Sequence, residues 1–234
     1  MLAVSVVFSF AACGSSSSGG AQQSSAQGII ERPANVSAEE GGQSGGGIGA
    51  QVNSGSNILI AYFTSPETDG VDTVASASRV ATENGVLGST EFIASEIQKN
   101  IGGDLFKIET VQKYPGTHSE LLDFAYNEKS SDARPELASR IEDINAYDYI
   151  FVGYPNWNAD LPMPMYTFFD EYDLSGKTII PFVTHGGSGF SNTINTIKKL
   201  EPGATVVEAG LSVSRNSASN AQSDVKAWTD SLIG

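Results

Sequence analysis

The sequence predicts an α/β protein built on a doubly wound, five-stranded parallel sheet with helices on both faces. Between residues 57 and 234, short continuous apolar runs alternate with segments of helical periodicity. This alternation is typical of a parallel sheet that is covered on both faces. Five such runs in a domain of this size favour a doubly wound sheet. The 234 residues, 40% of them hydrophobic, suffice for one sizeable core.

The strands are expected at apolar runs that are bounded by turn residues. The first, "ILIAYF", is a continuous apolar run, as a strand buried on both faces should be. The five expected strands are "ILIAYF" (58–63), "DLFKIET" (104–110), "YDYIFVGYP" (147–155), "KTIIPFVTHGG" (177–187) and "ATVVEAGLSV" (204–213).

The helices are expected between these runs. In residues 88–103, the apolar residues Phe92, Ile93, Ile97 and Ile101 follow helical spacing and end in a Gly-Gly pair, which is a good helix stop. The other expected helices are residues 119–130, 134–144, 163–172, 188–200 and 220–234.

The segment before this domain predicts a lipid-anchored leader, residues 1–13. "LAVSVVFSFAAC" is apolar, too short to span a bilayer as a helix, and ends in small residues and Cys13, which is the single cysteine. "FAAC" followed by Gly14 resembles the lipobox of bacterial lipoproteins, and that resemblance implies that Cys13 is acylated and becomes the mature N-terminus. The alternative is a cleaved signal peptide with an incidental cysteine.

Residues 14–56 are rich in Gly, Ser, Gln and Ala and predict a flexible, disordered tether. Behind a lipid anchor, such a tether would let the folded domain, residues 57–234, stand off the extracytoplasmic face of a membrane. The net charge of −14 disfavours nucleic acid and anionic lipid headgroups as partners, because like charges repel. Contact with a membrane is therefore expected only through the anchor.

Ligands of doubly wound sheets bind beyond the carboxyl ends of the strands, so the loops after the first, third and fourth strands are the candidate site. Thr64 and Ser65 follow the first strand, and Ser89 and Thr90 open the next predicted helix. Hydroxyls beside a helix N-terminus suit a phosphate group. The alternative is an ordinary helix, capped by Ser89, behind a long surface loop.

The loop after the third strand contains Pro155, Asn156, Trp157 and Asn158. An indole beside amide side chains suits a planar heteroaromatic ring, which would stack on its face and form hydrogen bonds at its edge. The alternative is that Trp157 covers the top of the core.

The loop after the fourth strand, "THGGSGF", contains three glycines that permit close backbone approach. It resembles an esterase loop, but the order of residues argues against a hydrolase. Phe190 replaces the last glycine of the nucleophile motif, and both histidines of the chain, His118 and His185, precede Ser188. Two histidines without a cysteine pair also disfavour a transition-metal site, and no dinucleotide fingerprint follows the first strand.

Together these stretches resemble flavodoxin-like proteins, and most closely a bacterial group that includes lipoproteins. The matching stretches are "ILIAYF", "GGDLFKIE", "YP" at Tyr114-Pro115, "ARPEL", "YDYIFVGYPNW", "PMP", "YDLSGKTIIPFVTHGGSGF" and "IKKLEPGATV". The resemblance implies a flavodoxin-like fold that binds FMN. It implies that Thr64, Ser65, Ser89 and Thr90 hold the phosphate, that Pro155, Asn156, Trp157 and Asn158 line the isoalloxazine, and that Thr184, His185, Gly186 and Gly187 contact its other edge.

Two departures from that family stand out. The segment from Pro66 to Leu87 interrupts the compact phosphate loop, and Ser76 or Ser78 within it could reach the phosphate instead. Asn158 stands where the family commonly has a second tryptophan.

The function that the resemblance implies is electron transfer or FMN-dependent reduction, for example of a quinone-like acceptor, at the extracytoplasmic face of a membrane. The protein would be either an oxidoreductase or a non-enzymatic electron carrier, with a redox partner protein or a small electron acceptor, and the His185 region could donate a proton. The alternative is a lipid-anchored binding module that keeps the fold without the flavin.

Overall fold

The computed structural model describes residues 52, 57–66, 68, 79–83 and 85–233. The chain divides into two units, Met1–Ser44 and Gly45–Gly234, and every described residue lies in the second. Cys13 and the predicted leader lie outside the described residues, as does the predicted tether except Val52. Val52 is buried, and its N–H donates to the Leu232 carbonyl at 2.7 Å. Val52, which the sequence places in the predicted tether, therefore packs onto the folded domain.

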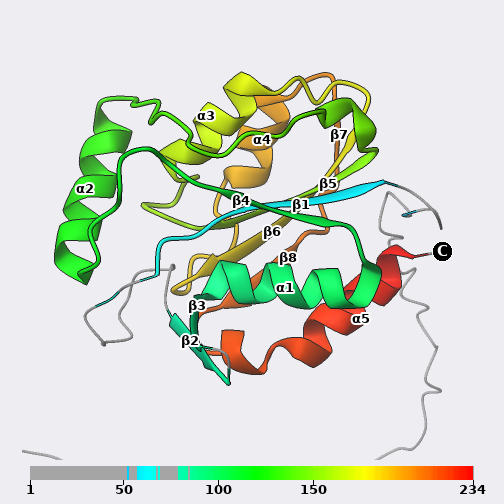
Figure 1. Ribbon diagram of the computed structural model, residues 1–234, viewed down its shortest axis with the longest axis horizontal. Coiled ribbons are helices and arrows are strands. Elements are labelled where there is room, and N and C mark those ends of the chain that lie inside the picture. Colours follow the sequence, from blue (N-terminus) through cyan, green and yellow to red (C-terminus); the bar gives the residue numbers. More distant parts are fainter. Residues whose placement is uncertain (1–51, 53–56, 67, 69–78, 84, 234) are drawn as a thin grey trace, which may run out of the picture. The chain divides into compact units, whose positions relative to one another are not determined.

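A parallel sheet forms the middle layer of the domain, as predicted (Figure 1). Its strands are β1 (Ile58–Phe63), β4 (Asp104–Ile108), β5 (Tyr149–Pro155), β6 (Thr178–His185), β7 (Thr205–Val206) and β8 (Leu211–Ser214). The order is β4-β1-β5-β6-β7, and β8 also pairs with β6. Counting β7 and β8 as one position, this is the order 2-1-3-4-5 of a doubly wound sheet whose strand order reverses beside β1.

The predicted fifth strand, residues 204–213, is divided into β7 and β8. β7 pairs with the beginning of β6 and β8 with its end. Gly210 lies just before β8 and is packed so closely that a Cβ there would lie 2.5 Å from the Pro181 carbonyl oxygen. The prediction of one continuous fifth strand is wrong in this detail, although β7 and β8 both lie at the expected edge of the sheet, beside β6.

Two helices cover one face of the sheet and three cover the other (Figure 1). α1 (Ser89–Ile101) and α5 (Gln222–Leu232) lie on one side, and α2 (His118–Ser130), α3 (Met163–Glu171) and α4 (Thr193–Leu200) lie on the other. Two short 3-10 helices, η1 (Ile144–Ala146) and η2 (Ala218–Asn220), are also present. Each face packs its own apolar core, with Ile93 and Ile97 of α1 on one side and Phe168 of α3 on the other.

The helix predicted over residues 134–144 does not form. Instead, the Val111 N–H donates to the Glu136 carbonyl at 2.9 Å, and the Ala138 N–H donates to the Glu109 carbonyl at 2.7 Å. These bonds hold the segment extended and place Leu137 in the core. Tertiary backbone pairing and burial of one leucine outweigh the local helical pattern.

The segment from Pro66 to Leu87 is not an irregular loop throughout. β2 (Arg79–Thr82) and β3 (Gly85–Gly88) form an antiparallel hairpin that leads directly into α1. The sequence carried a signal for it, because an Asn-Gly pair at residues 84–85 is a common hairpin turn. Ser76 and Ser78, which we considered as phosphate ligands, lie outside the described residues.

Candidate functional site

The carboxyl ends of β1, β5 and β6 meet at one edge of the sheet, as the topology requires. Pro155 of β5 pairs with Thr184 of β6, and the Asn156 N–H donates to the Thr184 carbonyl at 2.8 Å. β1 lies on the other side of β5, and its last residue is followed by Thr64. The three predicted loops are therefore neighbours in space.

Thr64 and Gly88 approach each other closely at the beginning of α1. A Cβ built on Gly88 would lie 1.9 Å from the Thr64 hydroxyl oxygen. Thr64 is 7% exposed, and that hydroxyl has no hydrogen-bond partner among the described residues. A buried hydroxyl without a partner costs free energy, and this one lies beside a helix N-terminus, where backbone N–H groups and the helix dipole favour anions. These features fit the phosphate group that the sequence predicted here.

Gly88, and not Ser89, is the N-cap of α1, and no side chain caps the helix. The alternative of an ordinary helix capped by Ser89 is therefore wrong about which residue is the N-cap. Ser89 is the first helical residue and is buried. Thr90, the next residue, is also buried, and its hydroxyl lies 2.8 Å from that of Thr184. Thr90 thus ties the first turn of α1 to β6.

Trp157 is largely covered in this structure. The indole is 5% exposed and belongs to the core above the sheet. Phe63 contacts it edge-on at 5.5 Å between ring centroids, and Tyr114 lies 5.6 Å from it at a tilt of 58°. This geometry favours the alternative in which Trp157 covers the core. Stacking of Trp157 against a flavin stays a prediction.

Trp157 begins a tight turn whose tip is exposed. Its N–H and carbonyl pair with the Asp160 carbonyl and N–H, at 3.1 and 2.9 Å. Between them, Asn158 and Ala159 have φ angles of 52° and 59°. This left-handed region suits Asn better than Ala. Asn158 therefore lies at an exposed tip, while Trp157 lies beneath it.

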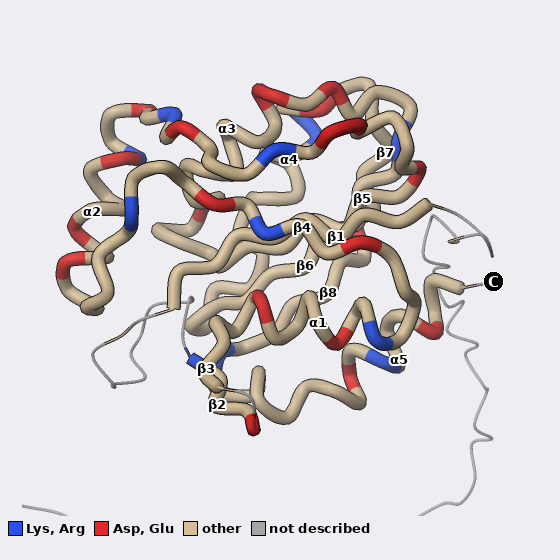
Figure 2. Tube along the Cα trace, viewed as in Figure 1, with Lys and Arg blue, Asp and Glu red and all other residues tan. Residues whose placement is uncertain are grey.

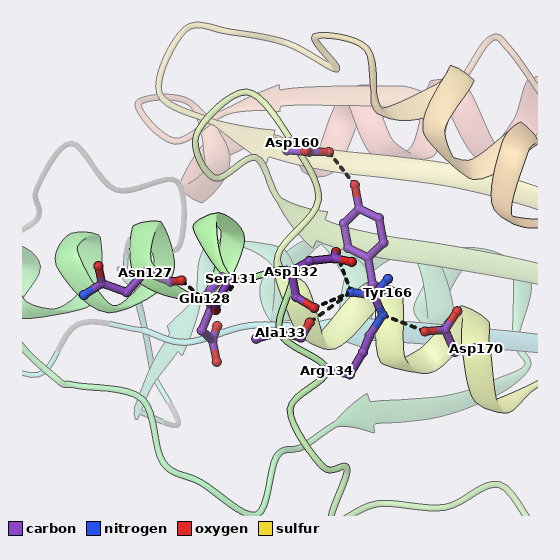
Figure 3. A network of polar contacts seen from close by, with 9 residues as sticks. All are labelled: Asn127, Glu128, Ser131, Asp132, Ala133, Arg134, Asp160, Tyr166 and Asp170. Atoms are coloured by element: carbon purple, nitrogen blue, oxygen red, sulfur yellow. Dashed lines mark hydrogen bonds and ion pairs between the residues drawn. The ribbon is translucent and has the colours of Figure 1, made fainter.

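Asp160 anchors this turn to two helices, and Figure 3 shows its contact with Tyr166 of α3. Its carboxylate accepts a hydrogen bond from the Tyr166 hydroxyl of α3 at 3.0 Å and lies 3.2 Å from the Lys129 ammonium of α2. Lys129 also donates to the Asn158 carbonyl at 2.8 Å. The position of the loop is thus determined by side chains outside the predicted site.

Arg134 extends this network on the far side of Tyr166 (Figure 3). Its guanidinium lies 5.1 Å from the centre of the Tyr166 ring and donates to Asp170 at 2.6 Å and to Asp132 at 2.8 Å. Burial and the charge of Asp160 raise the pKa of Tyr166, so the phenol keeps its proton and remains a donor to Asp160.

The loop after β6 places His185 beside the glycines. The Gly187 N–H donates to His185 Nδ1 at 2.9 Å, so in the neutral ring the proton lies on Nε2. Burial lowers the pKa of His185, which favours this neutral form. Asn156 joins the loop, because its side-chain amide donates to the Gly189 carbonyl at 2.8 Å and to the Ser191 hydroxyl at 3.0 Å.

Tyr114 and Glu128 belong to the site region, and we had assigned no role to either. Tyr114 donates to a Glu128 carboxylate oxygen at 2.7 Å, and burial raises the pKa of both groups. The tyrosine also borders a cleft of about 180 Å³ at the ends of β1 and β4. The cleft is lined by Phe63, Thr64, Ser65, Pro66, Lys107, Ile108, Glu109, Thr110, Lys113 and Tyr114. The "YP" stretch at Tyr114-Pro115, which matches the family, was the signal in the sequence that could have placed Tyr114 at the site.

Fold and site together define a flavodoxin-like protein. The sequence pattern of the family described as Flavodoxin matches residues 79–232. The chain therefore belongs to the flavodoxin family.

Solved structures agree with this assignment. A candidate flavoprotein from Bacteroides eggerthii is 26% identical, with a TM-score of 0.51 over 76% of this chain and 98% of its own. Another from Bacteroides uniformis is 25% identical, with a TM-score of 0.53 over 75% and 99%. A flavoprotein from Lactobacillus acidophilus in complex with FMN is 18% identical, with a TM-score of 0.51 over 72% and 99%, and shows the same fold.

No curated protein shows a significant match to this chain. Within the described ranges, no helix has the length and apolar character needed to cross a bilayer. The same residues contain no group of three or more His, Cys, Asp or Glu side chains placed to hold a metal ion.

Proposed function

We propose that this chain binds FMN and serves in electron transfer or FMN-dependent reduction. The observation that carries the proposal is the buried, unpartnered Thr64 hydroxyl beside Gly88 at the N-terminus of α1. That arrangement supplies a hydroxyl, helical N–H groups and close backbone approach, which is what a phosphate monoester needs. The Lactobacillus acidophilus flavoprotein of the same fold was crystallised with FMN, which supports the choice of ligand.

The ring of the flavin would lie between the loops after β5 and β6. Asn156 follows β5 directly and His185 ends β6, and the Gly186-Gly187 backbone, with φ 137° at Gly187, can approach an edge of the ring closely. His185 is held with Nδ1 as an acceptor, so its Nε2–H is the donor available to a bound molecule. FMN supplies the redox chemistry when bound, and the protein orients it and sets its surroundings.

The charge of the protein would influence that chemistry. Acidic residues are scattered over both helical layers (Figure 2), and the whole chain carries −14. A negative surface opposes the gain of negative charge by a bound ring, which lowers its reduction potential. Such a surface also favours a redox partner with a basic or neutral face over an acidic one.

We further propose an extracytoplasmic location with a lipid anchor at Cys13. The support is the sequence alone, namely the apolar run that ends in "FAAC" and the Gly/Ser-rich residues 14–56 behind it. Metabolic labelling with a palmitate analogue tests this, comparing the native chain with Cys13→Ser. Label that persists in the Cys13→Ser protein would contradict an anchor at this residue.

A second candidate function is a lipid-anchored binding module that does not bind flavin. The burial of Trp157 in contact with Tyr114 favours it, because the indole does not present an open face to a ring in this arrangement.

A flavin titration of the full purified chain decides between the two functions. FMN binding quenches flavin fluorescence and shifts the visible absorption bands. We expect saturable quenching with one equivalent of FMN. Fluorescence that stays unchanged over a wide range of protein concentration would contradict the first function and support the binding module.

A further inference from the structure

Two arginines, Arg79 and Arg215, have guanidinium nitrogens that are buried without a hydrogen-bond partner among the described residues. Arg134 and Arg140 form ion pairs with acidic residues. By contrast, Nε of Arg79 and both Nε and Nη1 of Arg215 are buried without a hydrogen-bond partner among the described residues. Buried guanidinium nitrogens without acceptors are costly. The chain has 27 acidic and 13 basic residues, so carboxylates to pair with these two arginines are abundant. That these nitrogens have no such partner suggests that they bind an anion from outside the chain.

Arg79 is the first residue of β2 and lies beside the beginning of α1. It is the β2 residue opposite Gly88 of β3, and opposed residues of an antiparallel pair have Cα atoms roughly 4.5–5.5 Å apart. Gly88 is the N-cap of α1 and contacts Thr64. Arg79 therefore adjoins both features that make this helix N-terminus a phosphate site.

Arg215 approaches the same region from the other end of the chain. It follows β8, and its N–H donates to the His185 carbonyl at 2.9 Å. η2, three residues further on, packs against both α1 and β2. The hairpin and the beginning of α1 lie together at this end of the domain (Figure 1). Arg215 thus adjoins His185 at the end of β6, and the segment that follows it packs against the hairpin that contains Arg79.

We propose that Arg79 and Arg215 form a cationic clamp for the phosphate monoester of the bound flavin. This inference rests on the proposed function, and it goes beyond the hydroxyl ligands that the sequence predicted. A dianionic phosphate accepts charge-assisted hydrogen bonds from guanidinium groups, which are well suited to its geometry. The clamp makes the site selective for FMN over riboflavin, which lacks the phosphate.

The acidic side chains nearby leave room for this role. Glu91, in the first turn of α1, is 3.6 Å from the Lys107 ammonium of β4 and accepts a hydrogen bond from Tyr62. Its negative charge is therefore partly balanced by Lys107. Glu83 belongs to the turn of the hairpin, at the end opposite the Arg79–Gly88 pair.

The test compares FMN with riboflavin on the full chain. Dissociation constants for both flavins are measured by fluorescence quenching for the native protein, Arg79→Gln, Arg215→Gln and the double variant. We expect each single variant to weaken FMN binding by about tenfold, the scale of one lost charge-assisted hydrogen bond, and the double variant by more. Riboflavin affinity should change by less than about twofold, because no phosphate contact is lost.

Two controls separate the clamp from general effects. Arg140→Gln removes a cation at an exposed site paired with Glu171, and it should leave the ratio of FMN to riboflavin affinity unchanged. Arg79→Lys and Arg215→Lys keep the charge without the planar fork, so their FMN affinities should lie between those of the native protein and the Gln variants.

Salt provides a readout on the native protein if a Gln variant fails to fold. FMN affinity should fall as ionic strength rises from low to physiological values, and riboflavin affinity should not. An unchanged FMN-to-riboflavin ratio in the double variant, or native FMN affinity that does not respond to salt, would overturn the clamp while leaving flavin binding intact. Native protein that binds neither flavin would overturn the proposed function itself.

Discussion

The hydroxyl oxygens of Thr90 and Thr184 lie 2.8 Å apart in a fully buried contact between α1 and β6. The two residues are 94 positions apart in the chain. Each adjoins a different part of the candidate site, because Thr90 lies in the first turn of α1 and Thr184 precedes His185. This hydrogen bond therefore couples the phosphate end of the site to the loop after β6.

We expect Thr90→Val to lower the free energy of unfolding by about 1–2 kcal/mol, because the buried Thr184 hydroxyl loses this partner. The double variant Thr90→Val/Thr184→Val should lose less than the sum of the single variants. Denaturant unfolding measures both. Thr205→Val, at an exposed strand position, is the matched control and should not destabilise. Additive losses in the double variant would show that the two hydroxyls do not interact.

Gly88→Ala tests the close approach at the beginning of α1. The backbone of Gly88 has φ −70°, which alanine adopts without strain, so any effect is steric. We expect a lower melting temperature and weaker FMN binding, because the new Cβ would lie 1.9 Å from the Thr64 hydroxyl oxygen. Adding Thr64→Ala removes that oxygen and should restore most of the melting temperature. A single variant that melts and binds like the native protein would show that Thr64 moves aside at no cost.

Trp157→Ala distinguishes a core residue from a flavin wall. Because the indole is buried and contacts Phe63 and Tyr114, we expect a loss of about 3–5 kcal/mol in the free energy of unfolding. Trp157→Phe should recover part of it. FMN affinity is measured on whichever variant remains folded. Unchanged stability together with lost FMN affinity would contradict the packing described here and support direct stacking.

The raised pKa of Glu201 predicts that the stability of the folded protein depends on pH. Burial, aided by the charges of Asp173 and Asp170, raises its pKa from 4.5 to about 7. The folded protein therefore binds more protons than the unfolded chain between these values, and its stability falls as pH rises through this window. Glu201→Gln keeps an oxygen acceptor near the Leu174 N–H and removes the charge.

We expect the Glu201→Gln variant to melt at a higher temperature than the native protein at pH 8. The two proteins should melt alike well below pH 4.5, where the carboxyl is protonated in both the folded and the unfolded state, and this comparison is the internal control. Melting curves at intervals of pH measure the difference. A difference that does not grow between pH 4.5 and pH 7 would contradict a raised pKa at Glu201.

Local patterns were enough for most of the fold. The runs "ILIAYF" and "IIPFV" are apolar throughout because both faces of β1 and β6 are covered by helices, and such runs can be read without knowing their neighbours. The helix from Ser89 was likewise predictable from its spacing and its Gly-Gly end. Where local and tertiary preferences disagreed, at residues 134–144, the prediction was wrong because the edge next to β4 offered backbone partners.

The site was predictable in location but only partly in its contacts. The strand ends bring Thr64, Asn156 and His185 to one edge because parallel strands all end there. The sequence could not show that Trp157 packs against Tyr114, because the two residues are 43 positions apart and the fold alone brings their loops together.

By itself, then, the sequence determined the class of fold, the edge of the sheet that carries the site and the kind of residues gathered there, because these depend on local hydrophobic pattern and chain order. The tertiary structure alone decided which groups are paired. It placed Arg79 opposite Gly88, left the Thr64 hydroxyl and Nε and Nη1 of Arg215 without partners among the described residues, and tied Asp160 to two helices. Such pairings depend on distances between segments far apart in the chain, and no periodicity encodes them.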